Sequence, residues 1–422
     1  MPRSDLTRKV YEIMEREMQD MGPFIVRKQC LLIHVDPESI EPSNLPHLAA
    51  KLSEVMVLFG GHEKAKKIYS ELRKLKDLDR IVSEETSEGA KLRMTEELGK
   101  GSLFAGEWDK ARGYFEQLLA EASARKDALA RTRYLKWLGM VHQEMGEFDQ
   151  ALARYETALA AAKNLGDRVE LANCHNSIGD ALWYKGAHSK AIDAYRRAAS
   201  DAESANYQAG VGRAYIGIGN VLADRHELED SIDSYKTALE NLKYTEDFQQ
   251  ISRCHNNLGD TYRQMKNWDD ALKSFRKSEE SAERAGWLNM VAWSRFNSAM
   301  ILVEKDTLAE AEEQLVKSEA TLRQMGDRAG IAGVQHAWGK LHAAKGNTSM
   351  MDRAYNEAIQ IYSSLKMPYY EAECHYELGT AYKKAGNRDK ALVNLRRAAV
   401  MYTDLKLDKW AKVAVKEIET MG

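Results

Sequence analysis

The sequence is poor in proline, in cysteine and in net charge, and it contains no long apolar run. Only 6 of its 422 residues are proline, which favours a largely helical chain because proline interrupts helices. The 61 basic and 64 acidic side chains give a net charge of -3, so no overall field draws the protein to nucleic acid or anionic lipid. No stretch approaches the roughly twenty apolar residues of a membrane span, and the N-terminus lacks the apolar core of a signal peptide. We therefore expect a cytoplasmic protein that binds neither nucleic acid nor membranes.

The prolines are unevenly placed. Five of the six fall within the first 46 residues, so the N-terminal segment differs in composition from the rest. Amphipathic patterns predict helices near residues 5–20, 24–34, 44–59 and 62–76. We expect residues 1–80 to form a small helical domain, in which the segment after Gly61 has the spacing of a degenerate first hairpin.

From about residue 85 the chain repeats itself every forty residues, most visibly in one small residue of a helix that we call helix A. A glycine inside a helix costs about 0.5–1 kcal/mol relative to alanine. Its regular return therefore indicates that another backbone approaches this helix closely. The series consists of Gly99, Gly139, Gly179, Gly219, Gly259, Ala299, Gly339 and Gly379.

A second helix, helix B, follows each helix A. Twelve residues after the first series stand Ala111, Ala151, Ala191, Ser231, Ala271, Ala311, Met351 and Ala391. One helical turn later stand the larger side chains of Phe115, Tyr155, Tyr195, Tyr235, Phe275, Leu315, Tyr355 and Leu395. Left-handed stops between A and B are predicted at Gly106, Gly146, Gly186, Gly346 and Gly386, with His226, Lys266 and Asp306 as replacements. Asp167 and Asp327 are predicted to cap the following A helices.

Four residue series thus share the same forty-residue period. Together they resemble the tetratricopeptide-repeat family over about residues 85–400. Segments such as Arg213–Gly219 and Gly326–Ala332 are similar to the long-repeat LGN/Pins adaptors, kinesin light chains and Rap-type bacterial regulators. The resemblance implies an all-α, right-handed α-α superhelix: eight forty-residue units over 85–402, a capping helix over 403–422, and the small N-terminal helical domain. It also implies that the A helices line a concave peptide-binding groove.

Polar residues recur at fixed offsets from the helix A glycine, on the face that the resemblance assigns to this groove. Asparagine is a mediocre helix former, so its clustering favours hydrogen bonding to the backbone of a bound segment, and arginine can grip carboxylates in a bidentate manner. The alternative interpretation is an ordinary solvated helix face. The candidate peptide-binding residues are Arg133, Asn173, Asn176, Asp180, Trp183, Arg213, Asn220, Arg253, Asn256, Asn257, Asp260, Arg263 and Asn297. Their mixture of charges predicts a partner segment of mixed charge with an acidic bias.

Three of the 4 cysteines precede a histidine, at Cys174, Cys254 and Cys374, and such pairs look like zinc ligands. Packed helices lie about 8–10 Å apart, so equivalent sites two repeats away should be separated by roughly 16 Å or more. Zinc–ligand bonds measure about 2–2.3 Å, and disulfides need similarly close contact, so these cysteines can share neither a metal ion nor a bridge. We expect them to pack in the core, and we predict no metal and no cofactor.

The function implied by the resemblance is a protein- or peptide-binding scaffold or adaptor, not an enzyme. No phosphate-binding loop, His-Glu-x-x-His motif or nucleophile elbow occurs in the sequence. The alternative comes from the Rap-type regulators, in which a helical N-terminal bundle precedes the repeats and acts on response regulators. In that case the chain would be a peptide-gated signalling regulator acting through residues 1–80.

Overall fold

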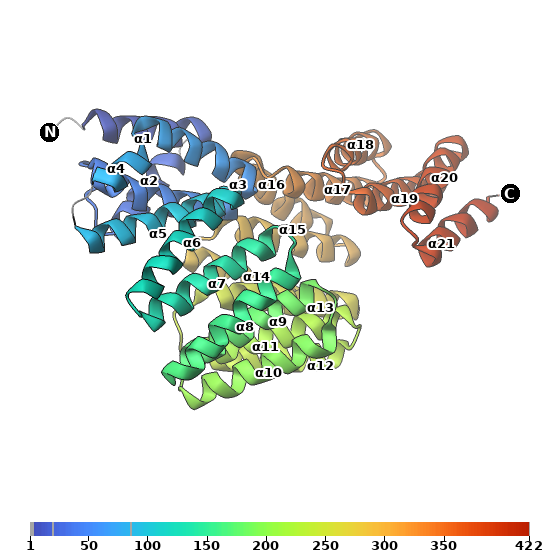
Figure 1. Ribbon diagram of the computed structural model, residues 1–422. Coiled ribbons are helices and arrows are strands. Elements are labelled where there is room, and N and C mark those ends of the chain that lie inside the picture. The colour runs from blue at the N-terminus through green and yellow to red at the C-terminus, as the bar shows by residue number, and fades with distance from the viewer. Residues whose placement is uncertain (1–3, 19–20, 85–86, 422) are drawn as a thin grey trace. The chain divides into compact units, whose positions relative to one another are not determined.

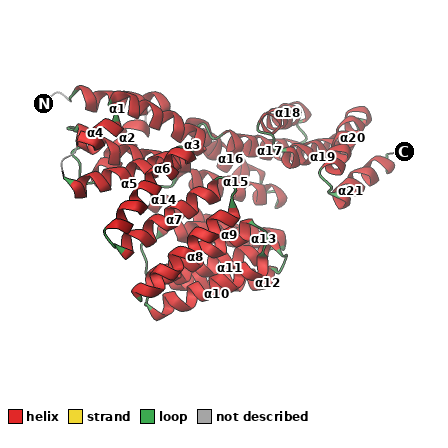
Figure 2. Ribbon diagram, viewed as in Figure 1, coloured by secondary structure: helices red, strands yellow, loops and turns green. Residues whose placement is uncertain are grey.

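The computed structural model describes residues 4–18, 21–84 and 87–421, and its regular elements within these ranges are helices (Figure 2). The predicted all-α class is confirmed. The chain divides into two compact units, Met1–Thr261 and Tyr262–Gly422. Within the described ranges, no helix is both long and apolar enough to cross a membrane.

The N-terminal part of the first unit contains the α-helices α1 (Asp5–Met18), α2 (Met21–Leu32), α3 (Leu45–Leu75) and α4 (Leu78–Glu84), with the short 3-10 helix η1 (Pro42–Asn44) before α3 (Figure 1). The prediction of separate helices near 44–59 and 62–76 was wrong, because α3 runs unbroken for 31 residues. Gly60 and Gly61 lie within this helix, and each costs only about 1 kcal/mol of helix stability, which tertiary packing can offset. Here Tyr69 is fully buried against α5 (Glu88–Phe104), and its hydroxyl donates to the carbonyl of Leu98 at 3.2 Å.

Helical hairpins then follow one another to the C-terminus. The A helices are α5, α7 (Ala128–Glu144), α9 (Arg168–Tyr184), α11 (Gln208–Asp224), α13 (Phe248–Gln264), α15 (Leu288–Glu304), α17 (Arg328–Ala344) and α19 (Pro368–Lys384). The B helices are α6 (Trp108–Ala124), α8 (Phe148–Leu165), α10 (His188–Ser204), α12 (Leu228–Leu242), α14 (Trp268–Ala285), α16 (Leu308–Met325), α18 (Thr348–Ser364) and α20 (Arg388–Asp404). A last helix, α21 (Asp408–Glu419), packs on α20. Both residue series fall on the helices predicted for them.

Most glycines of the first series make room for an aromatic ring, and Gly379 makes room for Leu395. A Cβ atom added to Gly219 would lie 2.6 Å from Cε1 of Tyr235, and one added to Gly99 would lie 2.9 Å from Cε1 of Phe115. The close approach was predicted correctly, but its cause was not. The group that approaches is the large side chain of helix B in the same hairpin, whereas the sequence pattern had indicated a backbone.

The turns between helices have the conformations that the sequence predicts. Gly106 and Gly186 have φ angles of 72° and 78°, and the replacements His226, Lys266 and Asp306 are also left-handed, at 58–59°. The caps form as well. The Asp167 carboxylate accepts a hydrogen bond from the amide of Glu170 at 3.0 Å, and the Asp327 carboxylate accepts one from the amide of Gly330 at 2.8 Å.

Candidate functional site

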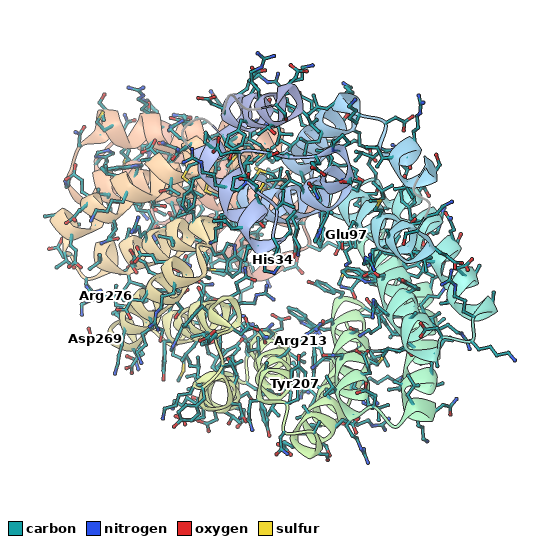
Figure 3. All side chains as sticks on the ribbon, turned by 90° about the vertical axis from the view of Figure 1, so that its left-hand side faces the viewer. His34, Glu97, Tyr207, Arg213, Asp269 and Arg276 are labelled. Carbon is teal, nitrogen blue, oxygen red and sulfur yellow. The ribbon has the colours of Figure 1, made fainter. Side chains whose placement is uncertain are left out.

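The predicted binding residues all lie on A helices. Arg133 is on α7; Asn173, Asn176, Asp180 and Trp183 on α9; Arg213 and Asn220 on α11; Arg253, Asn256, Asn257, Asp260 and Arg263 on α13; and Asn297 on α15. Arg263 and Asn297 belong to the second unit and the others to the first. Figure 3 shows the labelled Arg213 and Glu97 on the inner side of the arc that the helices of the first unit form.

Asp180 and Arg213 form an ion pair that joins α9 to α11. Arg213 Nη2 donates to Asp180 Oδ2 at 2.7 Å, and the hydroxyl of Tyr195 donates to Asp180 Oδ1, also at 2.7 Å. Burial alone would lower the pKa of Arg213, but the Asp180 carboxylate outweighs it and the pKa rises. The Arg213 side chain remains 42% exposed, so it is held in place and still accessible.

Asn220 and Asn257 form the equivalent link between α11 and α13. The Asn257 amide nitrogen donates to Asn220 Oδ1 at 2.9 Å, and the hydroxyl of Tyr235 donates to the same oxygen at 2.7 Å. We call this contact and the Asp180–Arg213 pair the two cross-repeat bridges. In each, the residue that follows a helix A glycine is held by the tyrosine of its own hairpin and bonds to the next helix A.

The remaining predicted residues differ in their surroundings. Asn176 is fully buried, with its amide nitrogen 3.4 Å from the carbonyl of Gly210, so it does not face a partner as the sequence analysis expected. The Trp183 indole donates to Asp224 Oδ2 at 2.6 Å. Arg133 is exposed and lies 3.4 Å from Glu96. Arg253 and Arg263 are exposed, whereas Asn173, Asn256, Asp260 and Asn297 are half-buried.

The second unit carries a charged cluster that the sequence analysis missed. The imidazole of His336 on α17 lies 2.6 Å from Glu377 Oε2 on α19, and the hydroxyl of Tyr355 donates to the same oxygen at 3.2 Å. Lys340 Nζ lies 3.1 Å from Glu304 and 3.2 Å from Glu377. Burial alone would raise the pKa of Glu377, but His336 and Lys340 outweigh it and lower the pKa to about 2. The cluster therefore holds ionised groups in fixed positions.

A cavity of about 720 Å³ lies in the second unit and is lined by α15, α17, α18 and α19. Lys340, Tyr376, Glu377 and Thr380 all line it. Tyr376 and Glu377 stand three and two residues before the glycine of α19, and Thr380 and Lys340 each stand one residue after the glycine of their own helix. The candidate residues of the first unit include residues at these same positions. The sequence analysis did not name these four residues because it considered mainly asparagine and arginine. The same offsets, applied to every residue type, would have predicted them.

The structure places the cysteines in the core, as predicted. All four are free and buried, and the described part of the chain contains no group of three or more His, Cys, Asp or Glu residues that could hold a metal ion. His175 and His375 bond to Asp201 and Asn394, at 3.0 and 2.9 Å.

Comparison with known proteins agrees with this architecture. The family model for the tetratricopeptide repeat matches residues 129–204 and 210–284. A search of curated proteins finds no match. Solved structures with a similar fold include the apo form of RapI, with a TM-score of 0.59 at 16% identity over 86% of this chain and 97% of that one.

Two further structures share the fold. Aspartyl phosphate phosphatase F from Bacillus subtilis has a TM-score of 0.56 at 14% identity, over 86% of this chain and 94% of that one. The Rap conjugation gene regulator of the plasmid pLS20, solved in complex with the Phr* peptide, has a TM-score of 0.50 at 15% identity, over 90% of this chain and 96% of that one. The tetratricopeptide-repeat model thus matches two stretches of the chain, and the fold of the chain is similar to the folds of these three structures.

Proposed function

We propose that this protein is a scaffold or regulator that binds a peptide or protein segment on the face formed by its A helices. The observation that carries this proposal is the 720 Å³ cavity of the second unit, which A-helix residues line at the same offsets that mark the candidate residues of the first. Cavities of roughly 300–1,000 Å³ are typical of ligand sites. The pLS20 regulator, which has this fold, was solved with a bound peptide.

The polar groups on this face are pre-organised for such a ligand. Arg213 and Asn257 are held by the cross-repeat bridges, and Lys340 is held between two glutamates. Groups that are already fixed lose little side-chain entropy when a ligand binds. Because the charges on the face are mixed, the partner segment is proposed to carry both signs, with an acidic bias where it meets the exposed Arg133 and Arg253. The four buried free thiols suit a reducing compartment such as the cytoplasm.

The proposal is tested by panning a random peptide library, displayed on phage, against the immobilised full chain. Enriched peptides are synthesised with a fluorescent label and titrated with the protein by anisotropy. Thr380→Tyr should fill the cavity and weaken binding at least about tenfold, or ~1.4 kcal/mol. Thr403→Tyr is the matched control, since Thr403 is exposed on α20 and does not line the cavity.

A second arm examines the first unit. Arg253→Ala and Asn256→Ala, made together, remove two candidate residues and leave both cross-repeat bridges intact. Weaker binding in this double variant places the peptide on the first unit, whereas weaker binding in Thr380→Tyr places it on the second. If the library yields no binder, or if neither change weakens binding, the A-helix face is not the binding surface.

A second candidate function follows from the likeness to aspartyl phosphate phosphatase F. Under this proposal residues 1–80 act on a phosphorylated response regulator, and a peptide bound to the repeats controls this activity. The full chain is incubated with receiver domains charged by acetyl phosphate, and aspartyl phosphate is followed by phosphate-affinity electrophoresis. Faster loss of phosphate than with buffer alone supports this output, and an unchanged rate removes it.

A further inference from the structure

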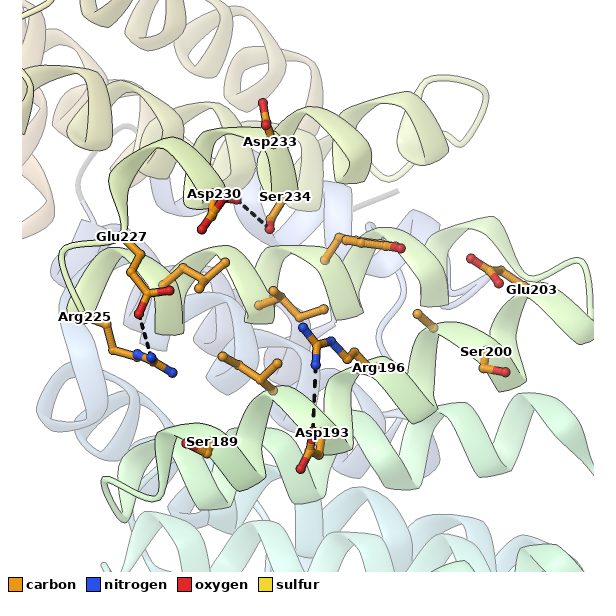
Figure 4. A pocket seen from close by; sticks show the side chains of 15 residues that line it. Ser189, Asp193, Arg196, Ser200, Glu203, Arg225, Glu227, Asp230, Asp233 and Ser234 are labelled. Atoms are coloured by element: carbon orange, nitrogen blue, oxygen red, sulfur yellow. Dashed lines mark hydrogen bonds and ion pairs between the residues drawn. The ribbon is translucent and has the colours of Figure 1, made fainter.

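A second groove lies on the outer, B-helix side of the first unit, away from the proposed peptide face. It runs between α10 and α12 over α11, and its volume is about 690 Å³ (Figure 4). Along α10 its lining extends from Ser189 to Glu203. Fourteen residues of helix span about 21 Å, so the groove is roughly four helical turns long.

One position of the repeat carries a smaller side chain on α10 than in the hairpins on either side. Eight residues after the small residue of helix B stand Leu119, Leu159 and Leu239 in the first, second and fourth hairpins, but Ala199 in the third. Leu119 and Leu159 are partly buried against core clusters that include residues of the following hairpin. The alanine leaves the corresponding space on α10 open.

The floor of the groove is apolar. Ile192 and Ile218 are each only 7% exposed and form its base together with Ala199. Tyr215 and Leu222 of α11 are half-buried and present further apolar surface to the groove. A bound side chain would therefore meet an aliphatic and aromatic surface.

The rim is acidic. Five carboxylates line the groove against two guanidinium groups, an excess of three negative charges. Both arginines already face acids, since Arg225 lies 2.6 Å from Glu227 and Arg196 lies 4.0 Å from Asp193. The other carboxylates are those of Glu203, Asp230 and Asp233, of which Asp233 lies 3.8 Å from Lys236. Figure 4 shows Glu203 and Asp230 on different walls of the groove.

We propose that this groove is a second docking surface, which takes a cationic amphipathic helix from a partner protein. The apolar floor fits the aliphatic stripe of such a helix, and the acidic rim fits lysine and arginine on its flanks. The length along α10 matches a helix of about fourteen residues. Phosphate-bearing surfaces, such as nucleic acid and anionic membranes, would be repelled by the excess negative charge. This inference does not depend on the proposed peptide face.

The probe is a fluorescein-labelled fourteen-residue peptide of leucine and lysine with helical periodicity, titrated with the full chain by anisotropy. Reversing two rim charges with Glu203→Lys and Asp230→Lys should raise the Kd about tenfold and reduce its salt dependence. Ala199→Leu should also raise the Kd about tenfold, by filling the floor with the residue that other hairpins carry. The matched control is Glu240→Lys, since Glu240 is 77% exposed on α12 and does not line the groove.

The proposal fails if the probe does not bind, if Glu240→Lys weakens binding as much as the rim variants do, or if a leucine–glutamate peptide or single-stranded DNA binds equally well. Circular dichroism checks that each variant folds. If Ala199→Leu does not fold, the rim variants alone decide the outcome. Thr380→Tyr should leave the Kd of this probe unchanged, so a failure here and a failure of the A-helix proposal can be told apart.

Discussion

Replacing Gly219 with alanine should destabilise the protein, although alanine is normally the better residue in a helix. Gly219 lies in the interior of α11, and an added Cβ would stand 2.6 Å from Cε1 of Tyr235. The Tyr235 ring is fully buried, and its hydroxyl is tied to Asn220 at 2.7 Å. The ring therefore cannot swing out of the way without losing that bond.

Two effects of opposite sign decide the magnitude. Overpacking a core by one methyl group costs about 1–3 kcal/mol. The gain in helix propensity from glycine to alanine is about 0.5–1 kcal/mol. The difference between these ranges is an expected net loss of about 0–2.5 kcal/mol in the free energy of unfolding, measured by urea denaturation followed by circular dichroism.

The chain offers its own controls. Gly113 lies within α6, and a Cβ added there meets nothing within 4 Å, so Gly113→Ala should stabilise the protein by about 0.5–1 kcal/mol. The sixth hairpin carries Ala299 opposite Leu315, so Gly219→Ala combined with Tyr235→Leu should lose less stability than the sum of the two single changes. Equal effects of alanine at Gly219 and Gly113, or strict additivity in the double variant, would refute the packing argument.

Three further predictions concern stability and reactivity. Burial opposes the charge on His336, but Cys374 and Glu377 raise its pKa well above 6.5, so its stabilising effect is full below pH 6.5 and is lost as the pH rises through the raised value. As the pH is raised above 6.5, the melting temperature should therefore fall more in the wild type than in His336→Gln. Asp167→Ala removes the cap of α9 and should cost about 0.5–2 kcal/mol in chemical denaturation, whereas Asp167→Asn should retain most of the stability. Burial raises the pKa of Cys174 to about 12, so this thiol should resist Ellman's reagent in the folded protein and react once guanidinium unfolds it; rapid labelling of the native chain would contradict the structure.

The sequence was sufficient to predict the hairpins because their signals are local. Glycine, the small residue of helix B and its aromatic partner recur at fixed spacing. The same spacing predicts the left-handed turns even where His226 replaces glycine. The prediction of a break within α3 was wrong because helix propensity contributes less free energy than burial does. Nothing local shows that Tyr69 packs that helix against α5.

The side-chain contacts of the site were harder to predict. Offsets place Asp180 and Arg213 on one face, but they do not show that the two bond to each other across 33 residues. The sequence therefore predicted Arg213 as a peptide-binding residue without its ion pair to Asp180. Asn176 has a groove offset and yet is buried, because the close packing of α9 on α11 covers it.

The two kinds of contact around the helix A glycine have different consequences for how a repeat array grows by duplication. A pair such as Gly219 and Tyr235 lies inside one forty-residue unit, so a duplicated unit carries both partners with it. A cross-repeat bridge joins two units, so every insertion or loss of a unit gives its residues new neighbours. The glycine series is correspondingly nearly uniform along the chain, while the links between units change from Asp180–Arg213 to Asn220–Asn257 and then to Lys340–Glu377. Adding or removing one unit should therefore keep each hairpin's interior intact and alter the polar contacts only at the new junction.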